Sequence, residues 1–506
     1  MAQSKTNLFS LQVAVESSIG VLPGSPTWFL LEPNDIGTFG ATIKTVARSP
    51  ISKLRQRRKG TIVDLDSAVE FEHDTTKEVV ILFSEGFVFA TYTTQVALAS
   101  GTNSLATDSD VAGAGTNGFV HTALSGALAD RALVYARGFL TNTAVHNGMH
   151  MVDGANSTTT VTAVTTASFI DEVPSLGAHA TLERAGHRGA SGDLTWTQST
   201  KTLGSTALNL TTLGLVVGQL IHLGGLTATN QFNGGVLYGR VRSIAAGAIV
   251  LDKITGTLVA DDTGAGKQID ILFGRFLRNV AVDHASYLTR SYQFEGYYDN
   301  LQNPDLTGPM YEYSLGNLAD TMEIKMPLTD KSTISFGFVG TDTQVPTTVR
   351  KTGASTPVLP VQTAPFGTTS DIARLRLTQL DEDGLTTCFK DLTFKMNNGV
   401  TPEKCLGTLG ATYMNVANFL VDLDMEVLFT NAEVVNAIRN NETVTMDFLL
   451  RNADGAIAVD VPAMTLGDGK KSFPINETIK IKLTGEAFID PTLGTSVGIS
   501  LFPAVP

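Results

Sequence analysis

Disulfide frameworks, membrane helices and a basic overall charge are all missing from this sequence. Its two cysteines, Cys388 and Cys405, cannot build a disulfide framework and are interpreted as thiols of a chain made in a reducing cytoplasm. No apolar run approaches the roughly 20 residues of a membrane helix, and the polar segment 1–7 is not followed by the apolar core of a signal peptide. The formal net charge of −13 argues against a protein whose main task is to grip nucleic acid.

Catalytic, metal-binding and cofactor-binding patterns are also missing. Gly113, Gly115 and Gly118 match a dinucleotide fingerprint only formally, because no hydrophobic strand precedes them. His146 and His150 are four residues apart, but the Asn-Gly-Met between them lacks the glutamate of a zinc protease helix. We therefore predict no catalytic residue, no metal site and no cofactor, and we interpret the chain as a protein that is not an enzyme.

One segment of the sequence occurs twice, with small differences. Val-Asp-Leu-Asp at 63–66 is followed by Val-x-Phe and then by Thr-x-x-Glu-Val-Val, and the same order recurs from 421 to 435 with three residues missing before the threonine. In each copy, the alternation of apolar and acidic residues predicts a strand with the valine and leucine on a buried face and the two aspartates on a solvent-exposed face. Thr75-x-x-Glu78 and Thr430-x-x-Glu433 resemble capping boxes that open short helices. Duplication of a strand–helix module is the favoured interpretation, with a chance match of two amphipathic segments as the alternative.

A cluster of cations interrupts this acidic chain between two strand-like segments. Its members are Arg48, Lys53, Arg55, Arg57, Arg58 and Lys59. Because strand patterns lie on both sides, we expect these residues to form the tip of a long hairpin. The tip is either an ordinary solvated loop or an arm that reaches an acidic neighbour.

The middle of the chain has a different character. Residues 100–130 are rich in Ala, Gly, Ser, Thr and Asp and are expected to form a linker. Two similar blocks with a period near 85 residues follow, and each contains an Asn-Gly pair, at 147–148 and 233–234, that indicates a hairpin. We interpret 110–275 as small β modules inserted at a loop tip, where insertions are tolerated.

Several stretches on either side of this block resemble the tail tube (major tail) protein of long-tailed bacteriophages. They are Glu16 to Trp28, the basic hairpin from Ser49-Pro50 to Lys59-Gly60, the strand–helix unit at 63–89, Tyr311 to Lys331, and the carboxy-terminal part with Asn397-Asn398, Asp424 and Val461-Pro462. The resemblance covers roughly 1–100 and 280–506, and the inserted block departs from the minimal family pattern. None of these stretches is a catalytic signature, so the resemblance is one of pattern and order.

The resemblance implies a mainly β fold with two tandem tail-tube-like β-sandwich or barrel modules, each with a short α-helix, plus the inserted small β modules. The expected division is 1–109 and 276–345 for the first module, 110–275 for the insertion, 346–370 for a Pro-rich linker and 371–506 for the second module. In this family, subunits form rings whose inner sheets close into a barrel, and stacked rings conduct the genome. Two modules in one chain imply that three chains close a pseudo-sixfold ring, with a hexamer as the alternative.

Two sets of candidate residues follow from this reasoning. The basic cluster, Arg48, Lys53, Arg55, Arg57, Arg58 and Lys59, is expected to contact the next ring. The repeated carboxylates, Asp64, Asp66, Asp422 and Asp424, are expected to face the lumen, where they would repel DNA phosphates, or else to lie on an outer face or subunit contact. The expected partners are other copies of the chain, other tail proteins and double-stranded genomic DNA that passes without specific binding, with no membrane.

The expected location is the phage tail of the virion, after synthesis in the host cytoplasm. A secreted or surface β-sandwich adhesin or carbohydrate-binding protein is the competing interpretation, since tandem β modules without catalytic groups would also suit it. The missing signal peptide counts against that alternative.

Overall fold

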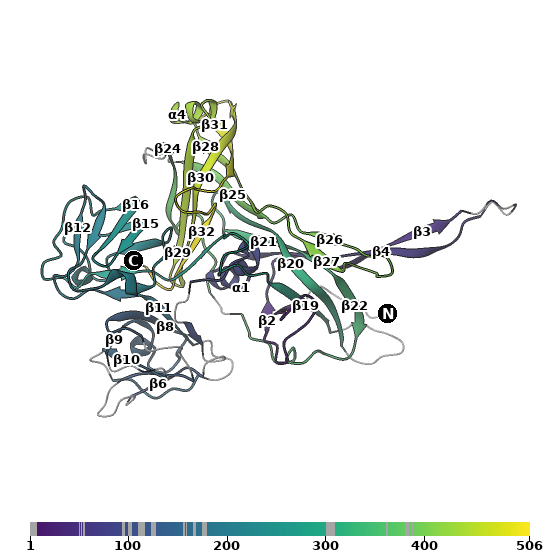
Figure 1. The fold of residues 1–506 in the computed structure, drawn as a ribbon, viewed down its shortest axis with the longest axis horizontal. Coiled ribbons are helices and arrows are strands. Elements are labelled where there is room, and N and C mark those ends of the chain that lie inside the picture. Colours follow the sequence, from purple (N-terminus) through teal and green to yellow (C-terminus); the bar gives the residue numbers. More distant parts are fainter. Residues whose placement is uncertain are drawn as a thin grey trace.

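The computed structural model describes residues 8–49, 51, 53, 56–93, 97–99, 104–109, 117–122, 128–154, 157, 159–164, 168–174, 180–299, 309–360, 363–379, 384–386 and 388–505. The fold is mainly β, as predicted. A β body carries a long two-stranded arm on one side and the inserted modules on the other (Figure 1).

The first module of the body is assembled from residues before and after the insertion. Its elements are β1 (Phe9–Val15), β2 (Trp28–Leu31), β3 (Asp35–Arg48), β4 (Arg58–Asp74), α1 (Lys77–Val88), β18 (Arg275–Arg278), β19 (Ser291–Tyr298), β20 (Met310–Pro327), β21 (Thr333–Gly340) and β22 (Asp342–Thr347).

The second module is formed by one stretch of the chain, from β23 to β32, with no inserted module within it. Its elements are β23 (Ile372–Gln379), β24 (Gly384–Thr386), β25 (Phe389–Asn397), β26 (Thr401–Glu403), β27 (Tyr413–Asn415), β28 (Leu420–Leu428), α4 (Glu433–Arg439), β29 (Thr443–Asn452), β30 (Gly455–Ser472), β31 (Lys480–Ala487) and β32 (Gly498–Phe502).

The two modules have the same strand pairings in the same chain order. In the first, β1 pairs with β19, β19 with β20, β20 with β21 and β22, β21 with β4, and β4 with β3. In the second, β23 pairs with β29, β29 with β30, β30 with β31 and β32, β31 with β28, and β28 with β25. Each module places its helix after the Val-Asp-Leu-Asp strand, so the repeat extends well beyond the segment visible in the sequence.

One sheet runs through both modules, and we call it the shared sheet. Its strand order is β3–β4–β21–β20–β25–β28–β31–β30. The modules meet where β20 pairs with β25, antiparallel from Thr321 opposite Asn397 to Pro327 opposite Asp391. The junction between modules is therefore a continuous hydrogen-bonded sheet.

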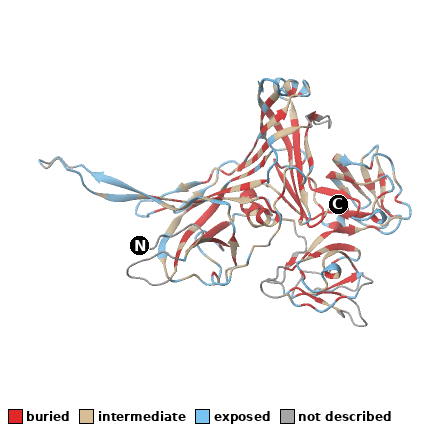
Figure 2. Cartoon of the chain, turned by 180° about the vertical axis from the view of Figure 1, so that it is seen from behind, coloured by how far each residue is buried: buried red, intermediate tan, exposed pale blue. Residues whose placement is uncertain are grey.

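A common hydrophobic core lies under the shared sheet and reaches into both modules. Val79, Phe83 and Phe87 are buried on one face of α1, as their helical spacing predicts, and Phe83 and Phe87 pack on Phe336 and Phe338 of β21. Burying each such phenylalanine contributes about 1.5–3 kcal/mol. Figure 2 shows the buried core of the body in red and the exposed arm in pale blue.

Three local predictions about the repeated unit are wrong. Helix α1 is capped by Thr76, whose side chain accepts from the Val79 amide, and not by Thr75. Helix α4 begins at Glu433, whose amide donates to the side chain of Asn431, so Thr430 is not its cap. Val63 is 53% exposed because β4 still lies in the arm at that point, before it reaches the body, and burial on this face begins at Leu65.

The inserted block holds two hydrophobic cores of its own, one formed by residues between 98 and 182 and the other between 194 and 273. Its elements are β5 (Ala97–Ala99), β6 (Ala106–Asp108), β7 (Gly118–Val120), β8 (Ala132–Arg137), α3 (Thr143–His146), β9 (Gly148–Val152), β10 (Thr160–Val164), β11 (Thr181–Arg188), β12 (Thr195–Thr197), β13 (Thr202–Gly204), η2 (Leu210–Leu213), β14 (Leu220–Leu223), η3 (Ala228–Asn230), β15 (Leu237–Ala245), β16 (Ala248–Gly256) and β17 (Asp270–Leu272).

Two expectations for this block are corrected. The segment 100–130 is not simply a linker, because β6 and β7 lie in it and pair with each other. Asn147 ends the short helix α3 and does not turn a hairpin, whereas 232–235 do form a tight turn.

Candidate assembly surfaces

The shared sheet has one continuous polar face, opposite the core and both helices. A single cross-strand row on it runs Glu72, Ser335, Glu323, Lys395, Asp422 and Glu486, each paired in register with the next. All four sequence-predicted aspartates lie on this face, since they alternate with the buried Leu65, Val421 and Leu423. Its carboxylates outnumber its lysines. The carboxylates are Asp64, Asp66, Glu70, Glu72, Asp74, Glu323, Asp391, Asp422, Asp424, Glu426 and Glu486, and the lysines on or beside this face are Lys44, Lys325, Lys331, Lys395, Lys404, Lys480 and Lys482.

The first aspartate pair is neutralised by two lysines, one from β3 and one from a hairpin of the second module. Lys44 Nζ lies 3.3 Å from Asp64 Oδ2 and 2.7 Å from Asp66 Oδ2. Lys404, from the hairpin that follows β25, contacts both carboxylates as well. The hydrogen bond from Lys404 is the main reason why the pKa of each aspartate is lowered.

Among the residues that the structure describes, the second pair has an equivalent of Lys44 but none of Lys404. Lys395 stands opposite Asp422, as Lys44 stands opposite Asp64, and its Nζ is 2.9 Å from Asp424 Oδ2. In the described part of the chain, Lys395 is the only cation in an ion pair with either carboxylate. Burial raises the pKa of Asp422, and the neighbouring Glu486 and Asp424 raise it further. The second pair is therefore short of positive charge.

The basic cluster lies at the far end of the β3–β4 arm, as predicted. Arg48 pairs in register with Arg58, and the described members Arg48, Lys53, Arg57, Arg58 and Lys59 are exposed; Arg55 lies outside the described residues. The arm also exposes four large apolar side chains, Ile43, Val46, Ile62 and Val63, each more than half accessible. A solvated loop tip would not need this apolar surface.

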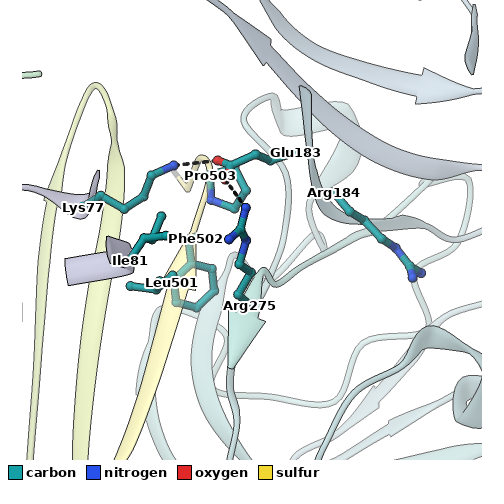
Figure 3. Close-up of a pocket in the computed structure, with 8 residues that line it drawn as sticks. All are labelled: Lys77, Ile81, Glu183, Arg184, Arg275, Leu501, Phe502 and Pro503. Atoms are coloured by element: carbon teal, nitrogen blue, oxygen red, sulfur yellow. Dashed lines mark hydrogen bonds and ion pairs between the residues drawn. The ribbon is translucent and has the colours of Figure 1, made fainter. Parts of the chain in front are cut away.

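The inserted modules are fixed to the body by buried ion pairs. Lys77, at the start of α1 and 2% exposed, has its Nζ 2.7 Å from Glu183 Oε2 of β11, and Arg275 Nη2 is 3.3 Å from Glu183 Oε1 (Figure 3). Burial alone would raise the pKa of Glu183, but Lys77 and Arg275 outweigh it and bring this pKa to about 2. A second ion pair joins Arg240 Nη1 of β15 to Asp460 Oδ2 of β30, 3.0 Å away; here burial outweighs the cation and the pKa of Asp460 is raised.

Among the described residues, no group of three or more His, Cys, Asp and Glu side chains is placed so that it could hold a metal ion. None of the helices in that part of the chain is long and apolar enough to cross a membrane.

Comparison with known proteins identifies the fold family. The model of the family described as phage tail tube protein matches residues 197–487, which is more than half of the 506 residues. The match begins within the inserted block and ends with β31, so it includes all of the second inserted core except Leu194 and Trp196, a core that the sequence resemblance had set apart. No curated protein matches the chain. The chain belongs to the phage tail tube protein family, and it is a structural component of a bacteriophage tail.

Proposed function

We propose that three copies of this chain close a ring, that rings stack into a tube, and that the lumen of the tube conducts the genome during ejection. The observation that carries the proposal is the β20–β25 junction. It joins two modules with identical pairings edge to edge, and the same operation repeated between chains would continue the sheet around a ring.

The edges needed for closure are open in the single chain. In the described residues, no strand pairs with the edge of β3 that faces away from β4, and β30 beyond Thr465 pairs only with β31. Because β3 is the equivalent of β25 and β30 the equivalent of β20, a β30–β3 contact between chains would copy the internal junction. Such closure removes exposed strand edges, which otherwise promote uncontrolled aggregation.

We infer that the polar face of the shared sheet, with Asp64, Asp66, Asp422 and Asp424, lines the lumen. The opposite face is occupied by the core and the helices, so only the polar face can meet water inside a closed sheet. A wall whose carboxylates exceed its lysines gains nothing from phosphate contacts, and duplex DNA would slide along it. The chain has no catalytic part in this process.

The mass of the isolated ring tests this function. Native mass spectrometry should give a species of three chains of 53.6 kDa each. A ring of six chains would contradict the proposed use of two modules per chain, and a purified protein that forms neither rings nor tubes would contradict the function as a whole.

A further inference from the structure

The second module sends a hairpin onto the first module, and this contact is visible within the chain. Residues 398–419, which include β26 and β27, leave the sheet between β25 and β28 and lie along β4 (Figure 1). Ala411 N donates to Thr341 O at 3.1 Å, just after β21, and Lys404 binds Asp64 and Asp66. One module is thus fastened to the next by a lysine on the repeated aspartates.

The second module has the same receiving surface, and no hairpin formed by the described residues lies on it. Among the described residues, the only ion pair of these two aspartates is that of Asp424 with Lys395, and Glu486 stands beside Asp422. Phe488 and Ile489 follow β31 as Thr341 follows β21, and they are 39% and 63% exposed. An unbalanced acidic cluster next to exposed apolar side chains is a surface that lacks its partner.

The arm consists of the end of β3 from residue 43 and the start of β4 up to residue 63, with the turn between them. It is the equivalent of the 398–419 hairpin, since it lies between the body parts of β3 and β4 as that hairpin lies between β25 and β28. Its tip carries Arg57, Arg58 and Lys59, and its stem exposes Val46 and Ile62 at 58% and 53%. The positive charges of the arm therefore complement the acidic cluster of the second module, and its exposed apolar side chains complement Phe488 and Ile489.

We propose that the arm of one copy binds the second module of the neighbouring copy in the same ring, with its cations on Asp422, Asp424 and Glu486 and its apolar stem on Phe488 and Ile489. This inference rests on the proposed ring. It assigns to the basic cluster a partner within the ring, where the sequence alone suggested a partner in the next ring.

Zero-length cross-linking of lysines to carboxylates tests the contact in the unaltered protein. Lys404 to Asp64 or Asp66 is the internal positive control, because this pair lies within one chain. Isolated single rings should give additional cross-links from Lys53 or Lys59 to Asp422, Asp424 or Glu486, joining two chains. The same cross-links found in stacked tubes but absent from single rings would place the arm between rings and overturn the inference.

Charge exchange gives a second test that separates this contact from the ring itself. Replacing Arg57, Arg58 and Lys59 by Glu should abolish the ring-sized species, as should Asp422→Lys with Asp424→Lys, while the combination of both sets restores it. Arg242→Glu, an exposed substitution on β15, is the matched control and should leave assembly unchanged. Normal rings from both reversed variants would overturn the inference alone, whereas an unaltered protein that forms no ring overturns the proposed function and the inference together.

Discussion

Glu183→Gln should loosen the joint between the inserted modules and the body. The substitution keeps the shape of the side chain but removes the charge that faces Lys77, which would then be buried without its counter-ion. The pKa of Glu183 falls from 4.5 to about 2 on folding. At 1.36 kcal/mol per pKa unit, the ionised carboxylate contributes about 3 kcal/mol of stability at neutral pH.

The pH dependence of this effect has a defined sign. Because the folded-state pKa is lowered, the contribution is complete above about pH 5 and is lost as the pH falls towards 2. The unaltered protein should therefore exceed Glu183→Gln in stability by about 3 kcal/mol at pH 7, and by about half of that or less near pH 3.

Urea unfolding of the dissociated chain at both pH values measures the difference. The chain has two tryptophans, Trp28 in the first module and Trp196 in the inserted block, so variants with one tryptophan report on the two parts separately. Glu477→Gln is the matched control, because its ion pair with Lys480 is exposed, and it should cost less than about 0.5 kcal/mol. Equal midpoints for Glu183→Gln and the unaltered protein at pH 7 would refute the reasoning.

Three further predictions follow from packing, chain connectivity and charge. Gly86→Ala places a methyl group 2.5 Å from the Tyr292 hydroxyl oxygen, and thermal unfolding should show a loss of about 1–3 kcal/mol, whereas Gly24→Ala meets nothing within 4 Å and should be nearly neutral. Deleting 94–274 with a short Gly-Ser link should still give tubes, thinner in electron micrographs, because the ends of the deletion are already hydrogen-bonded, from the 93 amide to the 276 carbonyl at 2.8 Å; a soluble, folded deletion protein that forms no ring would contradict this. Glu323→Lys should make empty tubes retain duplex DNA at low salt and release it as salt rises, and unchanged DNA retention would contradict a luminal position for this face.

The duplicated strand–helix unit and the basic hairpin could be predicted from sequence because both rest on local patterns. Alternation places Asp422 and Asp424 opposite Val421 and Leu423 whatever the tertiary context. Val63 escaped this reasoning, since burial depends on whether a strand still lies over the core, and period-two alternation does not say where it leaves.

The lysines that complete the repeat could not be found in the sequence. Lys44 and Lys395 occupy equivalent places, but they stand 20 and 27 residues before their first aspartates because the intervening hairpins differ in length. Lys404 reaches Asp64 across the module junction, a contact of very long sequence separation that no local spacing predicts. Glu183 likewise gains its importance only from Lys77 and Arg275, which tertiary structure brings to it.

Covalent linkage of two modules has a physical advantage for ring formation. The β20–β25 junction forms within a chain, at the effective concentration that covalent connection provides, so half of the edge contacts of the proposed pseudo-sixfold ring require no encounter between molecules. In the proposed ring, only the contact between β30 and β3 would then depend on protein concentration, and the arm would strengthen that contact.

A cryo-EM reconstruction of the assembled tube tests the central claim most directly. The account predicts three chains per ring, with β30 of one chain antiparallel to β3 of the next, in the manner of β20 and β25 within the chain, and with the polar face towards the lumen. Six chains per ring, or a β3 edge left unpaired in the tube, would contradict it.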